Sequence, residues 1–294
     1  MLEHVDRMLM AVRNRRLATE SFVKLLGAKW LRDEESSHLN GRAAVLAVGA
    51  SELELWEPAS LNAAAPAAGL VAEHLQRFGE GLMFAGYATS QLTALTQRLA
   101  SGGAAFVREN ERIFVSAQTT FGFPMVISEW KVRPQAGPVS YFYEATNSLQ
   151  TDWRVVARRY AELFGLEESR FSPINSPAFG YEGTLTLFAP AQRLDRIELS
   201  QTFADKPGSM RKFVERRGGD SFYMCFVEVK DFDGLRDRLL AAGATLTARS
   251  GNPANERDTL WVHPKNLHGM LLGVSRTGFA WDWSGQPERV PALG

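Results

Sequence analysis

The fold is decided by the stretch Asp231-Phe-Asp-Gly-Leu-Arg-Asp-Arg-Leu-Leu-Ala-Ala-Gly-Ala-Thr-Leu246. Leu235 and Leu239 recur at the spacing of one helical face. Asp231 can accept hydrogen bonds from the free backbone N–H groups of a first helical turn. Gly243 suits the left-handed residue that ends a helix. The stretch therefore predicts an amphipathic helix with a carboxylate cap, a glycine stop and a strand that follows.

The same unit occurs four times along the chain. Helices of similar length end at Gly27, at Gly102-Gly103, at Gly165 and at Gly243, and apolar strand patterns flank each of them. A single unit cannot bury both its helix and one face of its sheet, so the units must share a core in pairs. The sequence therefore predicts an α+β protein of four β-α-β-β-β modules, paired into two curled-sheet, open-barrel domains.

Prolines and glycines mark the expected boundaries between these domains. The stretch Lys131-Val-Arg-Pro-Gln-Ala-Gly-Pro138 lies near the middle of the chain and reads as a linker. We expect a first paired-module domain over residues 1–130, a second over 139–276, and an extended surface tail over 277–294. The low-complexity stretch 61–70 predicts a further linker inside the first domain.

Composition excludes several classes of protein. The 294 residues carry 33 basic and 33 acidic side chains, which gives no footprint for nucleic acid or for a membrane surface. No apolar run approaches the roughly 20 residues that a membrane helix needs, and the charged N-terminus is no signal peptide. Cys225 is the one cysteine, which fits a reducing compartment. We expect a soluble, cytoplasmic protein whose partner is a small molecule, with a homodimer as a further possibility.

Several segments resemble the vicinal-oxygen-chelate superfamily, which includes glyoxalase I, methylmalonyl-CoA epimerase, bleomycin-resistance proteins and extradiol dioxygenases. The segments are Asp6–Val12 and Leu53–Pro58, similar to the first module; Val71–Leu82, similar to the epimerase joint before the second module; and Val262–Leu272, similar to the closing His-Pro-Lys…Gly strand pair. The resemblance implies modules whose sheets curl around a shared cavity. It specifies the fold better than the reaction, because this fold hosts many chemistries.

The resemblance also allows the family's metal site to be tested position by position. Metal-dependent members hold a divalent ion with His, Gln or Glu side chains on four strands. In the first domain these positions fall on Arg7, Glu54, Phe84 and Val126, of which only Glu54 is a metal ligand. His4 lies three residues before Arg7 and would need a β-bulge to reach the same place. Whether His4 or Arg7 lines the cavity is left open.

The second domain is no richer in ligands. Its four positions fall on Tyr141 or Tyr143, Glu198, Tyr223 and Gly273. An extradiol iron site needs two histidines and a carboxylate, and neither domain supplies them. We therefore expect no metal and no other cofactor. The alternative is a divalent metal bound by His4 and Glu54.

The remaining side chains suggest a site for a flat organic molecule. Alternation puts Trp56 on the same face as Glu54, and Arg7 and Phe84 complete a cavity that is polar at one end and aromatic at the other. The second cavity would hold Glu198, Tyr223, Cys225 and Tyr141 or Tyr143. Alternatively, Arg7 and Glu54 form a structural ion pair in place of the metal, and the aromatic side chains fill the barrel.

We expect the protein to bind, and to isomerise or cleave, a small aromatic or hydrophobic molecule without a catalytic metal. Glu54 and Glu198 are the candidate general bases, because a carboxylate beside apolar rings gains proton affinity. The candidate ligand-binding residues are Arg7, Trp56, Phe84, Tyr141, Tyr143 and Tyr223.

Two alternatives to this reading stay open. The first is a non-catalytic protein that sequesters a drug or metabolite in the manner of bleomycin-resistance proteins, with Trp56 and Phe84 stacking on the ligand. The second is a metal-dependent dioxygenase or lyase, of extradiol or glyoxalase type, with ligands at non-standard positions.

Overall fold

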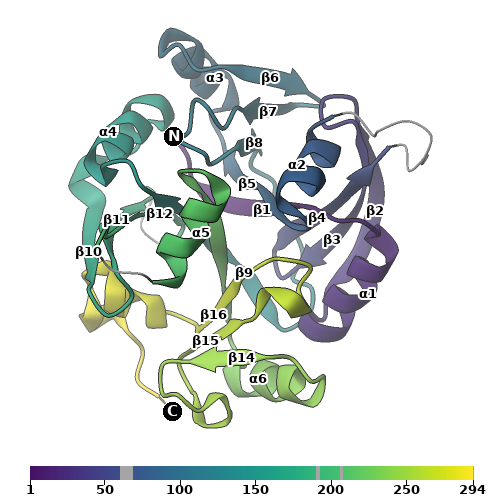
Figure 1. Ribbon diagram of the computed structural model, residues 1–294, viewed down its shortest axis with the longest axis vertical. Helices are drawn as coiled ribbons and strands as arrows, with labels where there is room; N and C mark the ends of the chain where they lie inside the picture. The colour runs from purple at the N-terminus through teal and green to yellow at the C-terminus, as the bar shows by residue number, and fades with distance from the viewer. Residues whose placement is uncertain (60–68, 190–192, 206–207, 294) are drawn as a thin grey trace.

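The computed structural model describes residues 1–59, 69–189, 193–205 and 208–293. Within these residues the strands form two sheets of eight strands each, one from each half of the chain (Figure 1). The first sheet has the order β2-β3-β4-β1-β5-β8-β7-β6, and the second has the order β10-β11-β12-β9-β13-β16-β15-β14.

The strands of the first sheet are β1 (His4–Ala11), β2 (Lys29–Ser36), β3 (Gly41–Val48), β4 (Ser51–Pro58), β5 (Gly81–Thr89), β6 (Phe106–Glu109), β7 (Arg112–Val115) and β8 (Met125–Glu129). The strands of the second are β9 (Val139–Leu149), β10 (Phe171–Ser176), β11 (Tyr181–Leu187), β12 (Arg196–Thr202), β13 (Ser221–Val229), β14 (Leu246–Ala248), β15 (Thr259–Val262) and β16 (Leu272–Arg276). The α-helices are α1 (Arg15–Leu26), α2 (Leu70–Phe78), α3 (Leu92–Ser101), α4 (Trp153–Phe164), α5 (Ser209–Arg217) and α6 (Phe232–Ala241). Short 3-10 turns are η1 (Glu168–Arg170), η2 (Pro253–Asn255), η3 (Pro264–Asn266), η4 (Phe279–Ser284) and η5 (Pro287–Arg289).

This order of elements confirms the α+β fold of four β-α-β-β-β modules. The first strands of paired modules lie side by side and antiparallel at the centre of each sheet, as β1 with β5 and β9 with β13. Each first strand is also parallel to the last strand of its own module, as β1 is to β4. The centre of each sheet is therefore built from four strands that belong to two modules.

The structure has the Asp231 cap and the Gly27 stop that the sequence predicts. In α6 the Asp231 carboxylate accepts a hydrogen bond from the backbone N–H of Gly234 at 2.9 Å, and Leu235 and Leu239 are buried. In α1 the Asn14 side chain caps the first turn, and Gly27 ends the helix with φ of 65°. A positive φ of this kind is readily adopted by glycine, which has no Cβ to clash.

One apolar core joins the two sheets. Tyr87 of β5 packs edge-on against Phe188 with 5.8 Å between ring centroids, and Phe123 packs against Phe222 at 4.8 Å. Cys225 of β13 belongs to this core. The structure therefore places the thiol in the shared core and not in the second cavity, and its burial raises the pKa of Cys225.

Helices from opposite halves also meet around this core. The helix α1 contacts α6, and α3 contacts α4. Arginines from the second half satisfy the free carbonyl groups at helix ends of the first half: Arg238 donates to the carbonyl of Val23 at 2.8 Å, and Arg159 donates to that of Gly102 at 2.6 Å. These bonds fix the two sheets relative to one another.

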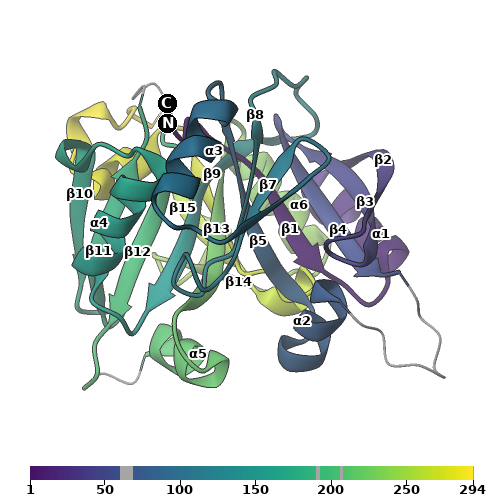
Figure 2. The same ribbon diagram turned by 90° about the horizontal axis from the view of Figure 1, so that it is seen from above.

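The opposite face of each sheet, which we call the inner face, carries a separate cluster of side chains. In the first sheet this cluster is covered by Val71 and Leu75 of α2. In the second it includes Tyr143 and Phe226, and α5 packs against β9 and β13. Figure 2 shows α2 and α5 on the same side of the molecule.

The C-terminal tail differs from the sequence prediction. It forms the turns η4 and η5, and Ala280 and Trp281 pack into the inner-face cluster of the second sheet. The physical reason is that this face offers a row of aromatic side chains, including Phe226, which would otherwise face water. The tail is thus part of the second domain's packing.

Two further elements were not predicted. The strand β10 contains Pro173, which has no backbone N–H to donate to a neighbouring strand. Proline is therefore tolerated mainly in edge strands, and β10 is an edge strand of its sheet. The helix α5 is highly polar and buries only Met210 and Val214. Residues 61–68 of the linker predicted at 61–70 lie outside the described residues.

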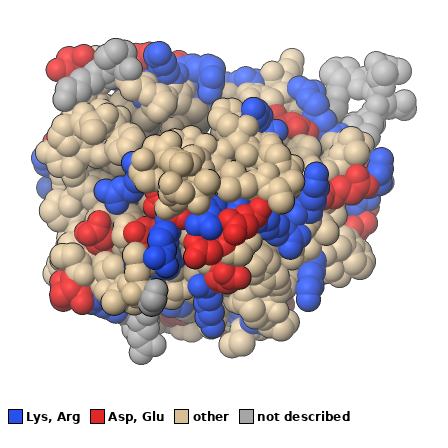
Figure 3. All heavy atoms as spheres, turned by 90° about the horizontal axis from the view of Figure 1, so that it is seen from below, with Lys and Arg blue, Asp and Glu red and all other residues tan. Residues whose placement is uncertain are grey.

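The surface agrees with the balanced composition. Lys and Arg side chains are interspersed with Asp and Glu on the face shown in Figure 3. None of the described helices has the length and apolar character required to cross a lipid bilayer.

We expect Trp281→Ala to lower the free energy of unfolding by about 3 to 5 kcal/mol, because it leaves a cavity between the tail and the second sheet. Trp30→Ala is the matched control, since Trp30 is 59% exposed and Trp281 is 6% exposed. Its cost should be about 0.5 kcal/mol. Urea denaturation followed by circular dichroism measures both variants, and equal losses would contradict the packing of the tail.

Candidate functional site

The four positions that the resemblance assigns to the metal in the first domain do lie on one inner face. Arg7 donates to Glu54 at 2.9 Å, and Phe84 and Val126 belong to the apolar cluster beside them. Gly86 lies opposite Arg7 on β5, where a Cβ would come within 2.0 Å of the Arg7 side chain. The glycine therefore makes room for a guanidinium on this face.

Glu54 lies at the centre of a buried network of charges. Its side chain is fully buried and accepts hydrogen bonds from Arg7 at 2.9 Å, from Arg112 at 3.0 Å and from the Trp56 indole at 2.9 Å. Arg112 also donates to Glu34 at 2.7 Å. Both oxygens of Glu54 are therefore occupied by donors of the chain itself.

In the rest of the network, too, each carboxylate is paired with arginines. Glu52 is paired with Arg32 at 2.9 Å and with Arg133 at 3.2 Å, and Asp6 is paired with Arg7 at 2.7 Å and with Arg133. Burial by itself would raise the pKa of Glu52, but hydrogen bonding to Arg32 and the charges of Arg7 and Arg133 lower it to about 2. The network as a whole pairs four carboxylates with four arginines: Asp6, Glu34, Glu52 and Glu54 with Arg7, Arg32, Arg112 and Arg133.

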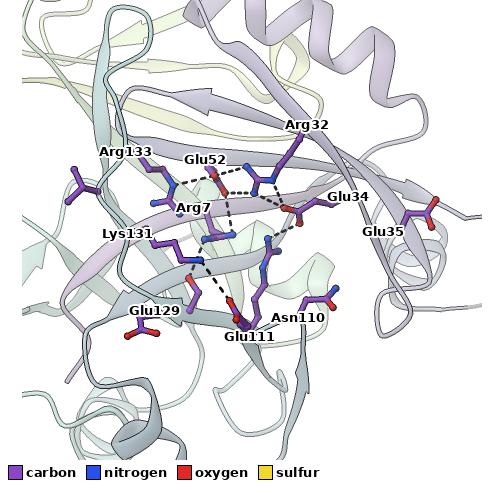
Figure 4. Close-up of a pocket in the computed structure, with 13 residues that line it drawn as sticks. Arg7, Arg32, Glu34, Glu35, Glu52, Asn110, Glu111, Glu129, Lys131 and Arg133 are labelled. Carbon is purple, nitrogen blue, oxygen red and sulfur yellow. Dashed lines mark hydrogen bonds and ion pairs between the residues drawn. The ribbon is translucent and has the colours of Figure 1, made fainter.

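A pocket of about 630 Å³ opens beside this network (Figure 4). Its rim also carries Glu35, Glu111, Glu129 and Lys131. Trp56 and Phe84 do not line it, because they are 1% and 5% exposed and pack in the cluster under α2. The polar end of the predicted cavity is therefore open, whereas its aromatic end is filled by the protein's own side chains.

Sequence reasoning missed three of the four arginines. Arg32, Arg112 and Arg133 come from β2, β7 and the segment after β8, far from Arg7 in the sequence. Arg112 stands at the start of a short apolar strand, which was the only local signal for it. Arg133 falls within the stretch that we predict as a linker, where a charged residue carries no such signal.

The structure answers which residue of β1 reaches the pocket. Arg7 lines it, whereas the His4 ring stacks on Trp130 at 3.9 Å and its Nδ1 lies 3.7 Å from a carboxylate oxygen of Asp195 in the second half. Glu54 pairs with the residue five positions after His4 on β1, a separation of about 16 Å along a strand. His4 and Glu54 therefore cannot share one ion.

These residues do not fit the metal that the resemblance implies. The guanidinium of Arg7 occupies one of the four positions and would repel a cation, while Phe84 and Val126 have no donor atoms. Across residues 1–59, 69–189, 193–205 and 208–293, no three His, Cys, Asp or Glu side chains are grouped so that they could hold a metal ion.

The second sheet has the same strand register as the first, but different residues stand at the equivalent positions. Glu54 pairs with the residue two positions after Arg7, and Glu198 pairs with the residue two positions after Glu144. Glu144 therefore occupies the place of Arg7, one residue beyond Tyr143. The sequence analysis missed Glu144 because a register shift in β9 inserts Tyr143 as an extra residue.

The tyrosines predicted for this site lie nearby but are already engaged. Tyr141 donates to Glu228 at 2.7 Å, and the Tyr143 hydroxyl lies 2.6 Å from that of Ser275. A second register shift makes Met224, not Tyr223, the counterpart of Phe84. All three tyrosines still belong to the inner-face cluster of the second sheet or pack against it.

Glu144 and Glu198 form a carboxyl pair. Burial raises the pKa of Glu144 to about 8, with Arg196 opposing the rise and Glu198 adding to it. Arg196 donates to Glu144 at 2.6 Å, and the hydroxyl of Thr146 donates to Glu198 at 3.0 Å. Glu144 therefore keeps its proton at neutral pH.

We expect Glu52→Gln to lower the free energy of unfolding at pH 7 by about 3 kcal/mol, because it leaves the surrounding arginines without a counter-charge. The folded pKa of Glu52, about 2, lies below its usual value of 4.5. Its contribution is therefore complete above pH 4.5 and is lost as the pH falls toward 2. Urea titrations across this range measure the difference. Glu35→Gln, an exposed rim residue, is the control, and a difference independent of pH would contradict the assignment.

Comparisons with known proteins agree with this architecture. No family model matches the chain, and no curated protein matches it. A variant of 4-hydroxymandelate synthase from Streptomyces coelicolor superposes with a TM-score of 0.72 at 16% identity, covering 94% of this chain and 93% of that one. A xylose isomerase-like TIM barrel/4-hydroxyphenylpyruvate dioxygenase fusion protein superposes with a TM-score of 0.63 at 11% identity, covering 94% of this chain and 49% of that one. The chain therefore shares the fold of these proteins, with two curled sheets and four modules.

Proposed function

We propose that the protein binds a small organic molecule at the inner face of its second sheet and catalyses a proton transfer on it. Glu198 acts as the general base and Glu144 as the general acid. The observation that carries the proposal is the placement of the two carboxyl groups on neighbouring strands, β9 and β12, two residues apart in the register, where burial and Glu198 raise the pKa of Glu144 to about 8. An acid and a base of different proton affinity in one site are what such a reaction requires.

The reaction that fits this pair is isomerisation or epimerisation next to a carbonyl group. Glu198 takes a proton from the carbon beside the carbonyl, while Glu144 gives its proton to the carbonyl oxygen. The enol that results is neutral. Return of the two protons, with the carbon reprotonated at another position or on its other face, gives the product and restores both carboxyl groups. No step of this sequence uses a metal ion.

The surroundings support an aromatic or hydrophobic ligand. The cluster at this face contains Tyr143, Phe226 and Trp281, and Trp261 and Trp283 pack against it. Aromatic side chains offer flat apolar contact with an edge for hydrogen bonding. Trp281 comes from the tail, so a ligand bound in this cluster would touch the C-terminal segment.

The same argument does not favour Glu54 as a base. Two arginines and the Trp56 indole donate to its carboxylate, so both of its oxygens are already engaged within the protein. Glu54 is better suited to anchoring the network that shapes the first pocket.

Glu198→Gln tests the proposal. Chelator-treated protein is incubated in D₂O with a panel of aromatic ketones and aromatic acyl thioesters, and NMR follows the exchange of the proton next to each carbonyl. We expect the wild type to catalyse exchange with at least one compound and Glu198→Gln to lose about 100-fold or more of the rate. Glu144→Gln should lose a similar factor, because it removes the acid.

Glu162→Gln, which removes an exposed carboxylate from α4, is the control and should retain the wild-type rate. Exchange that appears only after a divalent metal is added would contradict the proposal. So would exchange that is unchanged in Glu198→Gln.

A second candidate is binding without chemistry in the first-domain pocket. Its volume of about 630 Å³ lies in the range of small-molecule sites. The pairing of its buried carboxylates with arginines favours this reading, because no buried base in it is left unpaired. Calorimetry with the same panel separates the two: a ligand of this pocket would bind the wild type and Glu198→Gln equally and show no exchange in either.

A further inference from the structure

The helices α2 and α5, which precede the second and the fourth module, meet at their C-terminal ends and bring three arginines together. Arg77 lies in the last turn of α2, and Arg216 and Arg217 lie in the last turn of α5. A Cβ added at Gly218, the cap of α5, would come within 3.9 Å of the Arg77 guanidinium. Figure 2 shows the two helices projecting from the same side of the molecule. We call this region the α2–α5 seam.

The arginines of the seam lack the acidic partners that the arginines of the first pocket have. Among the described residues, no hydrogen bond or ion pair joins Arg77, Arg216 or Arg217 to an Asp or Glu side chain. The four arginines of the first pocket, by contrast, face four carboxylates. The nearest compensation in the seam is the pair of helix C-termini, whose partial negative charge is worth a fraction of one counter-ion.

Aromatic rings hold the guanidinium groups in place. The Arg217 guanidinium lies 4.2 Å from the centre of the Phe78 ring and 5.1 Å from that of Phe213. Arg77 lies 4.8 Å from the same Phe78 ring. Such contacts orient a guanidinium over an aromatic face but do not neutralise it. The seam therefore presents preorganised positive charge.

The local protonation equilibria reflect this excess of charge. Burial, together with the charges of Arg216 and Arg77, lowers the pKa of Arg217 to about 10. Burial and the charge of Arg217 lower the pKa of His74, on α2, to about 3. Holding like charges together costs free energy that a bound anion would return.

We propose that the α2–α5 seam binds the phosphate group of a phosphorylated small molecule. Three guanidinium groups exceed what one carboxylate needs, and their planar donor pairs match the oxygens of a phosphate or pyrophosphate. Arg77 and Arg216 are exposed, so such a ligand can reach them from solvent, while the half-buried Arg217 is held between two rings.

The seam adjoins the carboxyl pair of the second sheet. Phe213 packs on Tyr223 with 4.9 Å between ring centroids. The charge of Glu198 raises the pKa of Tyr223 and that of Arg216 lowers it, so both groups lie near its hydroxyl. A ligand anchored by its phosphate could therefore extend across Phe213 and Tyr223 toward Glu198. This extension rests on the proposed function, whereas the phosphate site itself does not.

Calorimetric titration of the full chain with inorganic pyrophosphate tests the site. We expect the wild type to bind one pyrophosphate and the double variant Arg216→Gln/Arg217→Gln to bind it about tenfold or more weakly, since two charge-assisted contacts are lost. Arg77→Gln should weaken binding by a smaller factor. Added sodium chloride should weaken binding by the wild type, because the contacts are ionic.

Arg158→Gln is the matched control: Arg158 is an exposed arginine of α4 with no acidic partner among the described residues, and it lies outside the seam. This variant should bind pyrophosphate as the wild type does. The double variant should unfold at the same or a higher temperature than the wild type, because it relieves repulsion between like charges. Absence of binding by the wild type, or equal binding by the wild type and the double variant, would overturn the phosphate site.

Glu198→Gln separates this proposal from the proposed function. The variant should bind pyrophosphate with wild-type affinity, because Glu198 makes no contact in the seam. If the wild type binds pyrophosphate but exchanges no proton, the phosphate site stands and the acid–base role of Glu144 and Glu198 is contradicted. If it exchanges protons but binds no pyrophosphate, the acid–base role stands and the phosphate site is contradicted.

Discussion

The antiparallel pairing of first strands, β1 with β5 and β9 with β13, is the constraint on which the rest of the structure depends. One module cannot cover its own helix and sheet, and pairing two of them places their first strands at the centre of an eight-stranded sheet. The last strands then flank the centre, parallel to the first. The four strands of each inner face are fixed by this arrangement, whatever side chains they carry.

What those four strands carry decides what each inner face can do. At three matching places the first sheet has Arg7, Glu54 and Glu52, and the second has Glu144, Glu198 and Arg196. Both sets contain two carboxylates and one arginine. The first sheet draws in further arginines until its charges balance, and the result is a closed ionic network. In the second, Arg196 faces Glu144 without such help, and the surplus acid keeps a proton. The difference between a closed ionic network and a carboxyl group that keeps its proton thus comes from the neighbours of equivalent residues.

The four modules could be predicted from the sequence, but the contacts within the candidate site could not. Glycine stops after amphipathic helices, as at Gly27 and Gly243, are local signals, so the repeated architecture could be predicted. Glu144 could not be placed, because the extra residue at Tyr143 changes which side chains face inward and no local pattern marks it. The Arg7–Glu54 ion pair was foreseen as an alternative, but Arg112 could not be found, since it reaches Glu54 from another module. The tail was predicted to lie on the surface because the residues around Trp281 show no helical or strand-like apolar pattern. Its burial follows from contact with the aromatic side chains of the second sheet.

The central claim is that Glu144 keeps its proton at neutral pH beside Glu198. Infrared difference spectroscopy of the wild type against Glu144→Gln tests it most directly, because the C=O stretch of a protonated carboxyl group is separate from that of a carboxylate. Our account predicts a protonated-carboxyl band at neutral pH that is lost in the variant and that titrates in the wild type around pH 8. A wild type whose spectrum at neutral pH has no protonated-carboxyl band that depends on Glu144 would contradict it.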